Sequence, residues 1–128
     1  MRFIETKTHG YLDYLIGILL LILPSLMGWD LNEAKSIVPM AVGAGAILYS
    51  LMTAYELGAA KVISMPTHLT IDFIAGAFLA VSPWLFDFAD EVYLPHLIVG
   101  ILEIGASLMT KTNARTSTSA MHTGHHAV

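Results

Sequence analysis

The sequence contains no cysteine, which excludes disulfide bonds, thiolate chemistry and cysteine-bound iron–sulfur clusters. It also lacks a glycine-rich phosphate loop and a Gly-x-Ser-x-Gly segment, so nothing indicates a nucleotide-binding or serine-type catalytic site. Only 12% of the residues are charged and the formal net charge is −4. No basic cluster suited to a nucleic acid is present. We therefore expect no nucleic-acid partner, and the sequence predicts no catalytic residue.

What the chain has in abundance is apolar residues. Hydrophobic residues make up 55% of its 128 positions, and the mean hydropathy of +0.68 is far from that of an ordinary soluble protein. Four apolar stretches approach the ~20 residues that a helix needs to cross the hydrocarbon core. Because backbone groups in lipid must bond within their own segment, these stretches predict helices. We expect an all-α, polytopic four-helix bundle in a lipid bilayer, with helices near 10–29, 37–57, 69–88 and 92–109.

The charged residues predict how this bundle lies in the membrane. Lys35 is the one basic residue that flanks the second set of predicted helix ends. Under the positive-inside rule, the end with more basic residues faces the cytoplasm. We therefore predict a multi-pass protein of the inner (plasma) membrane with both termini cytoplasmic. The basic residues at the predicted cytoplasmic end are Arg2, Lys7, Lys61, Lys111 and Arg115.

The chain also carries an internal duplication. The pattern THxxxDxxxG begins at Thr8 and again at Thr67. The tetrapeptide SLMT begins at Ser50 and again at Ser107, so the second copy is slightly shorter than the first. Each copy is a predicted helical hairpin. A unit that crosses the membrane twice has its copy enter from the same side, so the two repeats are predicted to be parallel.

The duplication predicts the organisation of the whole chain. The first two-helix transmembrane repeat is expected over residues 1–60 and the second over 61–112. Residues 113–128 are polar and predict a disordered cytoplasmic tail. A chain this short is small for a complete transporter. We therefore expect a homo-oligomer or a place in a larger membrane complex.

Prolines and tryptophans also recur near the predicted outer ends. Pro24 and Pro83 each remove a backbone hydrogen bond, which predicts a kink in the first and third helices. Trp29 and Trp84 suit an aromatic belt at the membrane interface. The N-caps predicted for these two helices are Thr8 and Thr67.

The triplet SPW at 82–84, near the end of an outgoing helix in a duplicated hairpin, resembles the SPW-repeat family of small bacterial integral membrane proteins. In that family the triplet lies in the first helix of each two-helix repeat. The first repeat of this chain departs from the pattern, because it reads LPS at 23–25 and keeps only the proline. The resemblance implies an architecture and a bacterial membrane, and it implies no activity.

Polar residues recur at one level of the predicted helices. His9 and Asp13 are four positions apart, as are His68 and Asp72, so each pair shares one helix face. The regular rise of a helix, counted from the flanking lysines, places two further acids at a similar depth. A charge in hydrocarbon costs about 2.5–3.5 kcal/mol at a helix centre, so such residues face the bundle interior and pair or bind. The acids predicted to bind protons or a cation are Asp13, Asp72, Glu103 and Glu56.

The residue types leave several chemistries open. The carboxylates suit protons or a cation, whereas His9 and His68 together with carboxylates suit a divalent transition metal. The same two imidazoles suit a b-type haem, which would make the protein a redox subunit, or a quinone. The remaining alternative is a non-catalytic accessory or scaffold subunit, in which the polar cluster fixes helix register. His96 has no repeated counterpart and is predicted to lie at the outer interface.

Overall fold

A computed structural model describes residues 2–113, so most of the predicted tail lies outside the described residues. Within residues 2–113 the chain forms four α-helices and no strand beyond two isolated β-bridges. The helices are connected by two short turns and by the link 52–64. Their bounds are α1 (Thr6–Met27), α2 (Ala34–Leu51), α3 (Met65–Leu85) and α4 (Leu94–Met109).

Three of these helices are long and apolar enough to cross a membrane. They have 22, 18 and 21 residues, whereas α4 has 16 and is correspondingly shorter. Large apolar side chains cover the outside of the bundle, such as Leu15, Ile74 and Leu102. Exposed apolar surface of this extent suits lipid. The prediction of an all-α, multi-pass membrane bundle is confirmed.

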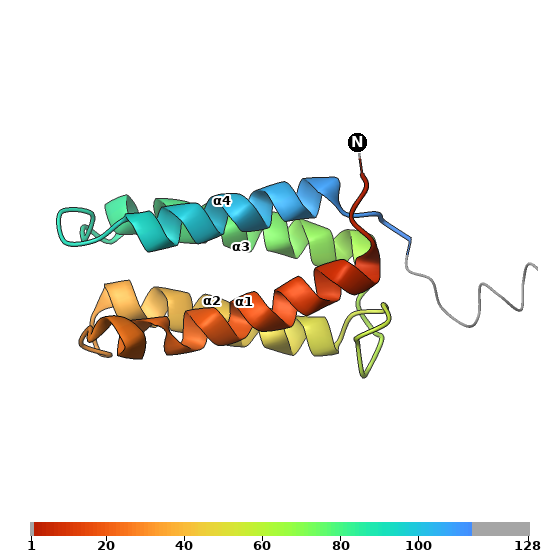
Figure 1. Cartoon of the computed structure of the whole chain (residues 1–128), viewed down its shortest axis with the longest axis horizontal. Coiled ribbons are helices and arrows are strands. Elements are labelled where there is room, and N and C mark those ends of the chain that lie inside the picture. The colour runs from red at the N-terminus through yellow and green to blue at the C-terminus, as the bar shows by residue number, and fades with distance from the viewer. Residues whose placement is uncertain (1, 114–128) are drawn as a thin grey trace, which may run out of the picture.

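The bundle consists of two helical hairpins that lie side by side (Figure 1). α1 packs mainly on α2, and α3 packs mainly on α4. α1 and α3 run in the same direction, which makes the two hairpins parallel (Figure 1). The N-terminal segment, the link 52–64 and the end of α4 share one end of the bundle, which we call the basic end after Arg2, Lys7, Lys61 and Lys111. The opposite end, the acidic end, carries Asp30, Glu33, Asp87, Asp90 and Glu91.

Glycines give the two hairpins the same close helix contact. A Cβ atom added at Gly43 of α2 would lie 2.6 Å from the carbonyl oxygen of Gly17 of α1. At the equivalent place in the second hairpin, a Cβ atom at Gly100 would lie 2.5 Å from the carbonyl oxygen of Gly76. Small residues let helix backbones approach in lipid, where no hydrophobic effect drives helices together. The sequence repeat is therefore also a repeat of packing.

Backbone pairing at the basic end connects each hairpin to the other. Thr53, which follows α2, forms a parallel bridge with Ile63, which precedes α3. Thr110, which follows α4, forms the equivalent bridge with Ile4, which precedes α1. The end of each hairpin is thus tied to the start of the other, and both threonines are held at the interface between the repeats.

The helices begin and end somewhat differently from the prediction. α3 begins at Met65, because the Ser64 side chain accepts the Thr67 backbone N–H at 3.3 Å. α1 begins at Thr6, and its N-cap Glu5 makes no side-chain cap bond. The predicted caps Thr8 and Thr67 are therefore wrong. α2 ends at Leu51, well before the end of the predicted stretch at position 57.

The segment 82–84 has a local role in α3. Pro83 has no N–H for the Leu79 carbonyl, and the Ser82 hydroxyl donates to that carbonyl at 2.7 Å. Trp84 is 55% exposed, and its ring centroid lies 5.7 Å from that of Tyr93. In α1 the residue before Pro24 is Leu23, which has no hydroxyl that could donate to the carbonyl left without its N–H partner. Both prolines lie in the last turns of their helices, where the predicted kinks stay a prediction.

Candidate functional site

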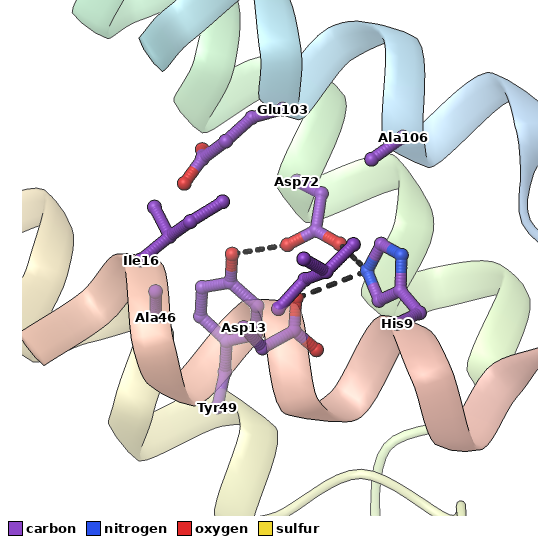
Figure 2. A pocket seen from close by; sticks show the side chains of 9 residues that line it. His9, Asp13, Ile16, Ala46, Tyr49, Asp72, Glu103 and Ala106 are labelled. Carbon is purple, nitrogen blue, oxygen red and sulfur yellow. Dashed lines mark hydrogen bonds and ion pairs between the residues drawn. The ribbon is translucent and has the colours of Figure 1, made fainter.

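Two histidines and two aspartates converge between α1 and α3, at the level of the first helical turns. His9 and Asp13 come from α1, and His68 and Asp72 come from α3. One ligand atom from each residue lies within 4.8 Å of all the others. Figure 2 shows His9, Asp13 and Asp72 pointing toward one another from the two helices. We call these four residues the His–Asp centre.

Distances within the centre are those of hydrogen bonds and ion pairs. Nε2 of His9 lies 2.7 Å from Oδ2 of Asp72 and 3.0 Å from Oδ1 of Asp13. Nε2 of His68 lies 3.0 Å from Oδ2 of Asp13 and 3.1 Å from Oδ2 of Asp72. The angles at this second nitrogen nevertheless give no directed hydrogen bond among the described residues. Each ring thus faces both carboxylates, one on its own helix and one on the neighbouring helix.

The centre is shielded from the surroundings of the protein. The side chains of His9 and His68 are 2% and 0% exposed, and those of Asp13 and Asp72 are 9% and 6% exposed. Buried carboxylates need positive charge close by, because burial without it costs several kcal/mol per ion. That charge comes from protons or from a bound cation. These four residues therefore form a set of groups that could hold a proton or a cation between the two carboxylates.

Two threonines orient the imidazole rings. Nδ1 of His9 lies 2.7 Å from Oγ1 of Thr110, and Nδ1 of His68 lies 2.7 Å from Oγ1 of Thr53. Each threonine hydroxyl donates its own proton to a helix carbonyl at 2.6 Å, so it accepts from the ring. Nδ1 therefore carries the proton in both histidines. This arrangement turns Nε2 of both rings toward the carboxylates.

Two tyrosines donate to the aspartates. The Tyr49 hydroxyl donates to Oδ1 of Asp72, and the Tyr55 hydroxyl donates to Oδ2 of Asp13 at 3.0 Å. Burial raises the pKa of the Tyr55 phenol, as does the nearby Asp13 carboxylate, so this hydroxyl stays a donor. Neither tyrosine was among the site residues predicted from the sequence. The signal that could have pointed to Tyr49 is its position directly before the repeated tetrapeptide SLMT, in the last turn of α2.

Glu103 of α4 lines the cavity at the centre together with His9, Asp13 and Asp72. It is 9% exposed, and its Oε2 has no hydrogen-bond partner among the described residues. The cavity has a volume of about 10 Å³, which is room for one ion or one water molecule. This space is far smaller than a haem, so the geometry favours an ion over the haem alternative.

The other predicted site residues lie elsewhere. Glu56 belongs to the link 52–64, and both its carboxylate oxygens lie 2.8 Å from the Thr6 hydroxyl, outside the His–Asp centre. Trp29 at the acidic end stacks on His96, with ring centroids 5.6 Å apart. His96 lies in the first turn of α4 at the acidic end, where it is 1% exposed and its Nε2 lies 2.8 Å from the Lys35 carbonyl oxygen; its position at the membrane interface stays a prediction.

Comparison with known proteins is consistent with this architecture. No curated protein and no solved structure matches the chain. The model of the SPW repeat domain matches residues 7–110, which include both hairpins and all four residues of the His–Asp centre. The segment SPW at 82–84 lies within this match, at the end of α3. The chain belongs to the SPW repeat family.

Proposed function

We propose that this membrane protein binds one divalent transition metal ion at the His–Asp centre. The observation that carries the proposal is the convergence of four ligand atoms within 4.8 Å. Two imidazole nitrogens with two carboxylate oxygens form a mixed donor set that suits zinc, iron or manganese. A divalent ion would also balance the two buried carboxylates without leaving a net charge.

The ring orientation supports the same proposal. A histidine that binds a metal through Nε2 commonly donates its other ring N–H to a neighbouring acceptor, which fixes the tautomer. Thr110 and Thr53 are such acceptors for His9 and His68. Both Nε2 lone pairs are therefore available to a cation once no proton occupies them.

The test is elemental analysis of the detergent-purified protein, with metal titration of the stripped protein. We expect about one ion per chain, and loss of that ion in a His9→Ala/His68→Ala double variant. A His96→Ala variant is the matched control, because His96 is equally buried but lies at the acidic end. If the double variant binds as much metal as the wild type, the centre is not the site.

A second candidate function uses the same residues for protons. His9 and Asp72 form a directed hydrogen bond of 2.7 Å, which requires a proton between the two atoms. The centre would then bind protons, and Glu103 would extend it toward α4. A metal ion must displace the proton on His9, so metal binding should release at least one proton. Calorimetry in buffers of different ionisation enthalpy measures this release. A metal-free protein that binds no added metal would favour the proton function.

We also propose that the basic end faces the cytoplasm, which places both termini and the His–Asp centre on the cytoplasmic side of the inner membrane. The support is the charge asymmetry between the two ends. Lys35 at the acidic end is paired with Glu33 at 2.8 Å and lies 3.5 Å from Glu91. Because the acidic residues offset Lys35, the net positive charge that favours the cytoplasmic side is concentrated at the basic end. Whether copies of the chain associate, or join a larger complex, stays a prediction.

A further inference from the structure

The His–Asp centre repeats the internal duplication: each repeat contributes the same kinds of residue to it. A residue near the centre that lacks a counterpart in the other repeat therefore stands out. His9 and Asp13 of the first repeat correspond to His68 and Asp72 of the second. The threonines that orient the rings, Thr53 and Thr110, end the repeated tetrapeptide SLMT, and each acts on the histidine of the other repeat. A centre made of these groups alone would be symmetric about the axis between the hairpins.

Glu103 breaks this symmetry. It lies four positions before Ser107, and the residue four positions before the matching Ser50 is Ala46. Both residues line the cavity at the centre. One repeat therefore contributes a third carboxylate where the other contributes a methyl group. Figure 2 shows the Glu103 side chain extending from α4 toward the side of the cavity where Tyr49 lies, with Ala46 on the helix beyond.

The state of Glu103 indicates that the carboxylate has a ligand role. A buried carboxylate without a partner is costly, and helix packing alone would be served better by an apolar residue. Oε2 of Glu103 has no hydrogen-bond partner among the described residues, although the side chain is nine-tenths buried. The one phenol that lines the same cavity, that of Tyr49, already donates to Asp72. Glu103 is not one of the four residues whose ligand atoms converge within 4.8 Å, but it lines the same cavity, and its Oε2 accepts no hydrogen bond within residues 2–113.

We infer that Glu103 is a specificity-determining fifth ligand, which shifts the preference of the centre away from four-coordinate Zn²⁺ and toward ions of higher coordination number, Mn²⁺ or Fe²⁺. This inference rests on the proposed metal binding. Zn²⁺ is satisfied by four ligands in protein sites, whereas oxygen-rich sites with more ligands suit Mn²⁺. Intrinsic affinities favour Zn²⁺ over Mn²⁺ and Fe²⁺, so an added carboxylate narrows this difference.

The experiment compares the wild type with Glu103→Ala and the size-preserving Glu103→Gln, using Mn²⁺ and Zn²⁺ alone as probes. We expect the variants to lose about tenfold or more in Mn²⁺ affinity, with a much smaller change for Zn²⁺. Co²⁺ provides a geometric readout, because its visible d–d bands are stronger in four-coordinate than in five- or six-coordinate sites. The Glu103 variants should strengthen these bands. Glu56→Gln is the matched control, because it neutralises an acid that lies outside the centre.

The outcomes separate this inference from the proposed function. If the wild type binds no metal, both fail. If the wild type binds metal, but the Glu103 variants keep the same ratio of Mn²⁺ to Zn²⁺ affinity and the same Co²⁺ spectrum, the metal site stands and the role of Glu103 is overturned. An equal loss of affinity for both metals would mean that Glu103 only adds negative charge that attracts any cation. That result would also overturn its role in metal selection.

Discussion

Thr110 at the end of the second hairpin holds Nδ1 of His9 in the first hairpin at 2.7 Å. Thr53 at the end of the first hairpin holds His68 of the second in the same way, also at 2.7 Å. Each repeat thus supplies the acceptor that orients the other repeat's histidine. A single hairpin contains a histidine and a threonine, but it does not contain an oriented ring. The centre is complete only when both repeats are assembled, which gives the duplication a physical reason.

This exchange makes the threonines testable. We expect Thr110→Val to weaken metal binding by about 10–100-fold, because the His9 ring loses the acceptor that fixes its tautomer. Thr53→Val should act similarly through His68. Titration calorimetry with the stripped protein measures both. Thr70→Val is the control, since the Thr70 hydroxyl donates to the Pro66 carbonyl on the exposed side of α3. Equal affinities in all three variants would show that the threonines do not orient the ligands.

The glycine contacts predict a matched pair of stability effects. Gly100→Ala should lower the free energy of unfolding by about 1–3 kcal/mol, because the new Cβ atom would lie 2.5 Å from the Gly76 carbonyl oxygen. Gly105→Ala should leave stability unchanged or raise it by up to about 1 kcal/mol, since nothing lies within 4 Å of its Cβ position. Thermal unfolding in detergent compares the two. A destabilising Gly105→Ala, or a neutral Gly100→Ala, would contradict this packing.

The serine of the SPW segment gives a third prediction. Ser82→Ala should cost about 1 kcal/mol in stability, because it removes the hydroxyl that donates to the Leu79 carbonyl next to Pro83. Ser25→Ala is the control in the first repeat, where the serine follows Pro24 and is exposed. Chemical unfolding of the two variants in the same detergent checks the difference. If both cost the same, the hydroxyl of Ser82 does not compensate for the proline.

The sequence predicted the architecture because membrane helices depend on local properties. Apolar length, the THxxxDxxxG repeat and the i,i+4 spacing of histidine and aspartate are all visible along one chain. Together they predicted two parallel hairpins and placed His9, Asp13, His68 and Asp72 on facing helices. The structure brings these four residues together, with each histidine Nε2 within 3.1 Å of an oxygen of both aspartates.

The parts that escaped prediction depend on where helices end and which faces meet. The depth expected for Glu56 assumed that the helix continues through this residue, but α2 ends at Leu51 and the chain then turns. The same turn brings Tyr55 to the basic end of the bundle, where its hydroxyl donates to Oδ2 of Asp13 at 3.0 Å. The partners of the histidines are threonines from the opposite repeat. No pattern along the sequence reports contacts of this kind.

The natural absence of cysteine makes the orientation directly testable. We expect Ala59→Cys in the link at the basic end to react with a membrane-impermeant maleimide in inside-out vesicles, because we propose that the basic end faces the cytoplasm. Asp90→Cys in the acidic turn should react in right-side-out vesicles, and the unmodified chain is the blank, since it has no thiol. The reversed labelling pattern would show the opposite orientation in the membrane, with the His–Asp centre near the outer surface. Labelling of both positions from one side would contradict a bundle that crosses the membrane between them.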